Sequence, residues 1–461
     1  MCALLQIFTF GATAQERKIS VTVDISRCPI AVVMGAGFKD STSFGFLKSS
    51  AGVTGLEKRI SGLKFFDLGG GEVGHRELQA GEFLTEKPAS GWSYVIDLVP
   101  PEFTTAAAHI SWIGEEAGLL MATDMLPMGI GEGPAQFTVE LPEGWKTATG
   151  SKTFASSAND AVVFISKDAV RTPAGRNLFV NTAGKWHFTA SEAAEMTAEI
   201  AAEYSKMFGG EPEGEIEVNI LPFPMSANHG TWQAETRGRT VTIVAADMAF
   251  RTQSLQRLHE QLRHELFHLW IPNGVNLTGN YDWFYEGFAL YQSLRMAVGV
   301  NRIGFNDMLS TLTRAHAIAE RQSGSLLEAS KTRWAPGGTE VYARGMFTAF
   351  LTDLAMLTRS GGKQSVEDLL KEIYSRHHDG ESVDGNEAVL AAMERRPELG
   401  RIVEQYIRGG EALAEDALLR SAGFVLDGGR LTAVEKPSGR QKTILNRLGY
   451  NNWRRSPKFQ K

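Results

Sequence analysis

The stretch His264-Glu265-Leu266-Phe267-His268 decides how the rest of the chain is interpreted. A helix turns once per 3.6 residues, so His264 and His268, four positions apart, place both imidazoles on one face. Two imidazoles at this spacing can both bind Zn²⁺ through bonds of about 2 Å. Glu265 is too close to the first ligand to share the metal easily, but it is well placed to accept a proton from a metal-bound water. The stretch therefore predicts a zinc-binding helix that carries its own general base.

The residues around this stretch suit a helix that is buried in the fold. They supply an apolar surface, and Pro272 then ends the predicted helix. A second helical run, 284–298, brings Glu286 within reach eighteen positions after His268, where its carboxylate can complete a three-ligand zinc site. The alternative is a surface helix with two solvated histidines. The apolar residues are Leu262, Leu266, Phe267, Leu269 and Trp270.

The composition is that of an ordinary globular protein. With 461 residues, of which 43% are hydrophobic and 22% charged, the chain has enough material for two or three packed domains. The formal net charge of −6 and an isoelectric point near 6.0 give no indication of nucleic-acid binding. No window of about 18 or more apolar residues predicts a membrane span, so we expect no stable membrane insertion.

The first fifteen residues favour export. An apolar run over residues 3–14 ends in Ala12-Thr13-Ala14, the small-x-small pattern of a signal-peptidase site. Because the usual basic start is missing, we interpret residues 1–15 as the remnant of a signal peptide, which predicts a periplasmic or secreted protein. The alternative is an incidental apolar N-terminus in a cytoplasmic protein. Cleavage would leave Cys28 alone, so we expect no disulfide framework.

The chain then divides into regions of different character. Residues 16–185 contain short apolar or β-branched runs between Gly, Pro and Asp clusters, which predicts an antiparallel β domain. Residues 186–425 combine a few strands with many helices around the metal-binding helix, which predicts a thermolysin-like, mainly helical catalytic domain. Residues 426–461, with eight Lys or Arg and no acid from Lys436 onward, are interpreted as a frayed basic tail. The expected fold class is α+β.

Several elements can be predicted individually. Ser191 is the expected N-cap of a helix that ends at Phe208. The glycine-rich stretch 69–74 formally fits a dinucleotide-binding pattern, but no helix begins there and no βαβ unit surrounds it, so we interpret it as a hairpin turn. Further strands are predicted at 216–222 and 240–245, and further helices at 302–322, 341–358 and 364–376.

The other histidines are not expected to take part in the site. His259 lies five positions before His264, which turns it roughly 140° away from the ligand face and favours a surface or capping role. His316 lies on polar helical sequence with no partner at ligand spacing, so we expect it to be solvated. His229 is expected at the surface.

Beyond the metal-binding helix the sequence resembles a known family. The stretch Trp283-Phe284-Tyr285-Glu286-Gly287-Phe288, after His-Glu-Leu-Phe-His-Leu-Trp, resembles the gluzincin zinc metallopeptidases and specifically the glycyl aminopeptidase family. Segments similar to that family follow in order at 325–330 and 361–368, and 141–145 resembles its β domain. The resemblance extends from about residue 20 to about residue 425. It implies a β domain followed by a zinc peptidase domain.

The resemblance also implies roles for two further residues. Tyr342, in Val341-Tyr342-Ala343-Arg344-Gly345, looks like the aminopeptidase tyrosine whose phenol hydrogen-bonds the oxyanion that forms when water attacks the scissile carbonyl. The family also holds the substrate's α-amino group with a glutamate in a Gly-Gly-Leu-Glu-His segment. Here the segment 232–237 keeps Glu235 at the same offset but lacks the two glycines and the final histidine. The alternative is that Glu235 is a solvated loop carboxylate.

The resemblance implies a zinc-dependent aminopeptidase. Zn²⁺ would be held by His264, His268 and Glu286, with Glu265 as the base, and peptides would lose small N-terminal residues, Gly or Ala. Two alternatives remain open. The altered segment around Glu235 favours the same centre acting as an endopeptidase, and a third possibility is a non-catalytic peptide-binding protein that retains the metal. The sequence makes no prediction of the oligomeric state.

Overall fold

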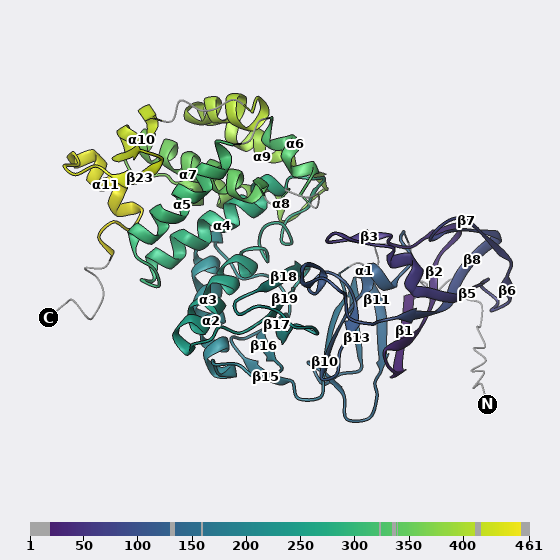
Figure 1. The fold of residues 1–461 in the computed structure, drawn as a ribbon. Helices are drawn as coiled ribbons and strands as arrows, with labels where there is room; N and C mark the ends of the chain where they lie inside the picture. Colours follow the sequence, from purple (N-terminus) through teal and green to yellow (C-terminus); the bar gives the residue numbers. More distant parts are fainter. Residues whose placement is uncertain are drawn as a thin grey trace. The chain divides into compact units, whose positions relative to one another are not determined.

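The computed structural model describes most of the chain, and the predicted signal-peptide remnant at 1–15 lies outside the described residues. The described chain forms two compact units (Figure 1). The first unit takes its residues from Met1–Arg171, Asn181–Lys185 and Val218–Asp247, and the second from Thr172–Val180, Trp186–Glu217 and Met248–Lys461. The described residues are 19–129, 134–157, 160–321, 324–333, 338, 340–410 and 416–452.

The first unit is built on an eight-stranded sheet with the order β13-β11-β1-β2-β8-β5-β6, in which β7 also pairs with β8. The prediction of an antiparallel domain is wrong at one pair, because β1 and β11 run parallel, with Ile19 opposite Ala135. A long connection separates these two strands, so no hairpin forces them to be antiparallel. The strands are β1 (Ile19–Arg27), β2 (Ile30–Gly45), β5 (Ile60–Phe66), β6 (Glu72–Val73), β7 (His75–Gln79), β8 (Glu82–Asp97), β11 (Pro134–Glu140) and β13 (Thr153–Ser157).

Alternation of side chains between two faces gives this unit its core. In β1, Val21, Val23 and Ile25 are buried, whereas the residues between them are at least partly exposed. The glycine-rich stretch 69–74 contains the predicted hairpin turn, because β5 pairs with β6 across the glycines at 69–71 and the Asp67 carboxylate accepts backbone N–H bonds from Gly69 and Gly71. The unit also contains a four-stranded sheet of order β12-β14-β10-β9, with β9 (Trp112–Ile113), β10 (Ala117–Met121), β12 (Lys146–Thr147) and β14 (Val162–Ser166).

A five-stranded sheet has the order β15-β16-β17-β19-β18, which leaves β18 at one edge. The predicted strands at 216–222 and 240–245 are confirmed as β17 and β19. The segment between them also forms a strand, β18, which pairs antiparallel with β19. The strands are β15 (Val170–Pro173), β16 (Leu178–Thr182), β17 (Ile216–Pro222), β18 (Trp232–Arg237) and β19 (Thr240–Ala245).

The second unit is mainly helical, so the predicted α+β class is confirmed. The N-cap of its helix α2 lies two residues earlier than predicted, because Thr189 rather than Ser191 caps the helix and forms a capping box with Glu192. The Tyr204 hydroxyl of α2 donates a hydrogen bond of 2.5 Å to the carbonyl of Arg263, which holds the predicted metal-binding helix in place. The helices are α2 (Ala190–Phe208), α3 (Arg251–Phe267), α4 (Asp282–Gly299), α5 (Phe305–Ala319), α6 (Leu326–Lys331), α7 (Glu340–Ser360), α8 (Val366–His377) and α9 (Gly385–Glu394).

The C-terminal segment corrects one prediction. Residues 426–461 were expected to form a frayed tail, but β22 (Phe424–Asp427) and β23 (Arg430–Ala433) form a hairpin and α11 spans Gly439–Arg447. Ser438 caps α11, and apolar side chains at 444, 445 and 448 are buried, so hydrophobic packing orders this basic segment. Residues 453–461 lie outside the described range. None of the helices in the described part of the chain has the length and apolar character needed to cross a bilayer.

Candidate metal centre

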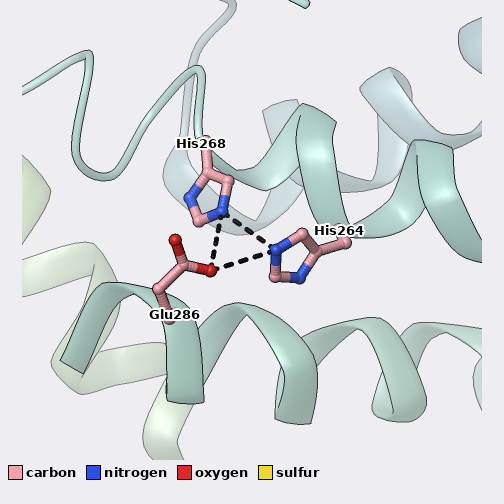
Figure 2. A group of neighbouring side chains, drawn as sticks. All are labelled: His264, His268 and Glu286. Carbon is pink, nitrogen blue, oxygen red and sulfur yellow. Dashed lines mark hydrogen bonds and ion pairs between the residues drawn. The ribbon is translucent and has the colours of Figure 1, made fainter. Parts of the chain in front are cut away.

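Two helices of the second unit bring the three predicted metal ligands together. His264 lies in the last turn of α3, His268 is the C-cap of that helix, and Glu286 lies in the second turn of α4. Figure 2 shows the two imidazoles and the carboxylate pointing toward one another from the two helices. Helix α3 ends at Phe267, earlier than the predicted end at Pro272, so the second histidine is at the very end of the helix.

The donor atoms of these side chains are close enough to share one ion. The Nε2 atoms of His264 and His268 are 3.2 Å apart, and Oε2 of Glu286 lies 3.1 Å from the first and 3.5 Å from the second. All three side chains are buried, and Oε2 of Glu286 accepts no hydrogen bond among the described residues. A buried acceptor of this kind normally has a partner. Two imidazole nitrogens and one carboxylate oxygen form a donor set typical of catalytic zinc, so the residues fit this metal.

The surroundings of His268 fix which of its nitrogens faces the site. Its Nδ1 atom lies 3.0 Å from the carbonyl oxygen of Ile271. Because a carbonyl only accepts hydrogen bonds, Nδ1 carries the proton, and the lone pair of the neutral ring is on Nε2. Hydrogen bonds of this type orient imidazole ligands in metal sites.

The carboxylate of Glu286 is held in its charged form despite its burial. Burial alone would raise the pKa of the Glu286 carboxyl, but the guanidinium of Arg333 and the neighbouring His268 hold it well below its usual range. A deprotonated carboxylate is the form that binds a metal ion.

The predicted base is next to this cluster. Glu265 is buried, and its Oε1 atom lies 3.9 Å from Nε2 of His264. That distance is longer than the distances among the three donor atoms, so Glu265 is beside the cluster rather than in it.

Tyr342 is connected to the same cluster through Arg333. Tyr342 lies at the start of α7, and the Cζ atom of Arg333 is 5.2 Å from the centre of its ring. Burial, together with the nearby charge of Glu286, raises the pKa of the Tyr342 phenol. The phenol therefore keeps its proton at neutral pH and can act as a hydrogen-bond donor.

Arg333 is a site residue that the sequence did not reveal. Its guanidinium contacts Oε1 of Glu286 at 2.7 Å, Oδ2 of Asp282 at 3.2 Å and the hydroxyl of Tyr285 at 3.1 Å. One sequence signal did exist. Asp282 and Glu286 are four residues apart on α4, and two carboxylates at this spacing repel each other unless a cation lies between them.

Glu235 lies in the first unit, on the edge strand β18. Its Oε2 atom is within hydrogen-bond distance of Nδ1 of the buried His109, and Nε of Arg237 is 3.4 Å from its Oε1 atom. Its side chain is 23% exposed and lies on a strand, so the predicted alternative is wrong about a loop position. The sequence could not show His109 as its partner, because 126 residues separate the two. The role of Glu235 as an amine anchor stays a prediction.

Two other histidines are buried although the sequence predicted exposed positions, and a third is exposed as predicted. His259 is buried and its Nδ1 atom contacts the Arg263 guanidinium, because both side chains lie on one face of α3. His316 is also buried, with its ring centre 4.9 Å from that of Phe347. His229 is exposed, as predicted, and contacts the carbonyl of Asp247.

Comparison with known proteins supports the fold. No protein-family model and no curated protein sequence matches the chain. Among solved structures, an aminopeptidase N family protein from Idiomarina loihiensis is similar with a TM-score of 0.73 at 15% identity, covering 91% of this chain and 82% of the other. An M1 zinc metallopeptidase variant from Deinococcus radiodurans, bound to a Tyr-Ser-Ala substrate, gives a TM-score of 0.57 at 15% identity, covering 86% and 94%. Yeast LTA4 hydrolase gives a TM-score of 0.53 at 11% identity, covering 91% of this chain and 68% of the hydrolase chain.

These similarities define the class of fold. At identities of 11% to 15% they establish that the chain shares the α+β architecture of M1 zinc metallopeptidases. The finer resemblance to the glycyl aminopeptidases stays a prediction.

Proposed function

We propose that this protein is a zinc-dependent aminopeptidase. The observation that supports this most is the buried convergence of His264, His268 and Glu286, with Glu265 beside them. A chain with the architecture of M1 zinc metallopeptidases and this donor set has the parts that metal-assisted peptide hydrolysis needs. We further propose that the second unit is thermolysin-like in the way its two helices present these ligands.

Each residue of the site has a distinct role in the proposed hydrolysis of a peptide bond. When bound by His264, His268 and Glu286, zinc would lower the pKa of a water to about 7 and polarise the scissile carbonyl. Glu265 takes the proton of the attacking water and delivers it to the leaving amine. The phenol of Tyr342 donates a hydrogen bond to the carbonyl oxygen as it becomes negative.

The preferred substrate and the location are separate parts of the proposal. A free α-amino group held by Glu235, and a small first residue such as Gly or Ala, are supported by the sequence resemblance around 283–288 and 232–237. Export to the periplasm or the medium is supported by the apolar run at 3–14. An endopeptidase with the same centre is the second candidate, because the segment around Glu235 lacks the family's two glycines.

The function can be tested with two substrate classes and one variant. Purified zinc-loaded protein should hydrolyse glycyl and alanyl p-nitroanilides, and should not act on the same compounds with acetylated amines. Glu265→Gln should bind zinc equally well but turn over about 10²–10⁴ times more slowly. If neither the unaltered protein nor Glu265→Gln hydrolyses these substrates with zinc bound, the catalytic proposal is rejected. Cleavage within acetylated peptides, at a rate equal to that for free peptides, would identify an endopeptidase.

A further inference from the structure

The two oxygens of Glu286 have different partners. Oε2 is the atom that lies 3.1 Å and 3.5 Å from the two imidazole nitrogens. Oε1 lies 2.7 Å from Nη2 of Arg333. The guanidinium therefore occupies one oxygen and leaves the other facing the imidazoles.

Arg333 is itself held in place from a second side. Its Nη1 atom donates to Oδ2 of Asp282 at 3.2 Å and to the hydroxyl of Tyr285 at 3.1 Å. Tyr285 in turn donates a 2.6 Å hydrogen bond to Oδ1 of Asp282. All of these partners lie in the first two turns of α4, so the planar guanidinium is fixed against the part of the helix that presents Glu286.

The same guanidinium also packs against Tyr342. Its Cζ atom is 5.2 Å from the centre of the phenol ring, within the range of a cation–π contact. The side chain of Arg333 is only 13% exposed, so water screens these contacts weakly. One residue from the segment after α6 thus joins the carboxylate ligand on α4 to the phenol on α7.

We propose that Arg333 is a positioning residue of the metal centre, which holds Oε1 of Glu286 so that Oε2 faces the two imidazoles and which seats the ring of Tyr342 beside them. The inference rests on the proposed zinc site, but it concerns the binding of the metal as well as turnover. A lysine could not replace it fully, because a single ammonium lacks the fixed fork that reaches Glu286 and Asp282 together. The competing explanation is that Arg333 only fastens its own segment to α4.

The experiment measures zinc affinity by competition with a chromophoric chelator. Arg333→Gln should lower the affinity about 10–100-fold, the range typical of losing a residue that orients a metal ligand. Arg333→Lys should show a smaller loss. The matched control is Lys331→Gln, which removes the same charge two positions before Arg333. The Lys331 side chain is 63% exposed, and it pairs at the surface with Glu328. The control should bind zinc as the unaltered protein does.

A second readout separates positioning from fastening. In zinc-saturated protein, Arg333→Lys should lower kcat at least threefold while KM for alanyl p-nitroanilide changes less than twofold, because the phenol acts on charge that develops during the reaction. Zinc affinity of Arg333→Gln within twofold of the unaltered protein, or an equal loss in Lys331→Gln, would overturn the proposal. If Arg333→Gln does not fold, Arg333→Lys decides by the same criterion. A protein that binds zinc but hydrolyses nothing would reject the proposed function, and the affinity comparison would still be decisive for Arg333.

Discussion

Gly287 and Gly345 are in direct contact: a Cβ atom added to Gly287 would lie 2.3 Å from the carbonyl carbon of Gly345. A Cβ atom on Gly345 would lie 2.3 Å from the carbonyl oxygen of Trp283. The backbones of α4 and α7 therefore approach each other at a point where only glycine fits. Gly287 follows the predicted ligand Glu286, and Gly345 is three positions after Tyr342, so this contact sets the spacing between the carboxylate and the phenol.

The first prediction concerns this helix contact. Gly287→Ala should destabilise the protein by about 1–3 kcal/mol, because the two backbones must separate to admit a methyl group. It should also lower zinc affinity, since the separation moves Glu286. Urea unfolding and a zinc competition assay measure the two effects.

Gly299→Ala on the same helix is the matched control for this prediction. Gly299 is exposed at the end of α4, and a Cβ atom there would have no heavy atom within 4 Å. This variant should change stability by less than about 1 kcal/mol, in the stabilising direction. Equal stability of Gly287→Ala and Gly299→Ala would show that the close approach of the helices is not a constraint.

The second prediction concerns the phenol. Tyr342→Phe removes a donor that is needed only as the carbonyl oxygen becomes negative, so kcat should fall about 10²–10³-fold. KM and zinc affinity should change little, because the ring and its contact with Arg333 remain. Steady-state kinetics on alanyl p-nitroanilide, together with zinc content, provide the measurement. A rise in KM with kcat unchanged would mean that Tyr342 binds substrate rather than the developing charge.

The sequence predicted the parts of the site that follow from local periodicity. His264 in the last turn of α3 and His268 at its C-cap follow from the helical spacing, and the acidic residue at the start of the next helix was also visible. Arg333 was not predictable in this way, because it lies outside any helix and meets Glu286 only through the tertiary fold. The contact between Gly287 and Gly345 was hidden for the same reason.

The rest of the fold shows the same division between local and non-local information. Strands β17 and β19 were predicted with their correct ends, because runs of apolar residues mark them. The parallel pairing of β1 with β11 was missed, because side-chain alternation shows which face of a strand is buried but not the direction of its neighbour. The C-terminal helix α11 was missed because its many basic residues obscured the apolar positions that are buried.

The third prediction concerns Glu235. If it holds the substrate's α-amino group, Glu235→Gln should raise KM for glycyl and alanyl p-nitroanilides by about 10–100-fold, as expected when a charged partner is removed. Any residual cleavage of acetylated peptides should be unaffected. Glu140→Gln is the control in the same unit, because its carboxylate is 52% exposed and its pairing with Lys152 is at the surface. Equal KM values for Glu235→Gln and Glu140→Gln would mean that Glu235 serves its contacts with His109 and Arg237 rather than the substrate.

The last prediction concerns the pH dependence of stability. Burial, reinforced by the charges of Arg263 and Arg302, lowers the pKa of His259 to about 4. The Glu199 carboxylate, whose Oε2 atom lies 3.6 Å from Nε2 of His259, acts in the opposite direction. In the unfolded chain the pKa of a histidine is about 6.5. Between these two values the unfolded chain binds a proton that the folded chain does not, so stability falls as the pH is lowered. The folded state should lose about 2 kcal/mol between pH 7 and pH 5 from this residue.

His259→Asn isolates that contribution, because the asparagine oxygen can replace Nδ1 as the acceptor for Arg263 but does not titrate. Urea unfolding of zinc-free protein at pH 7 and pH 5 should show a smaller loss of stability in His259→Asn than in the unaltered chain, by about 2 kcal/mol. Zinc-free protein is used because the ligand histidines then titrate identically in both proteins and cancel. The same pH dependence in both would mean that His259 takes up its proton in the folded state as readily as in the unfolded chain.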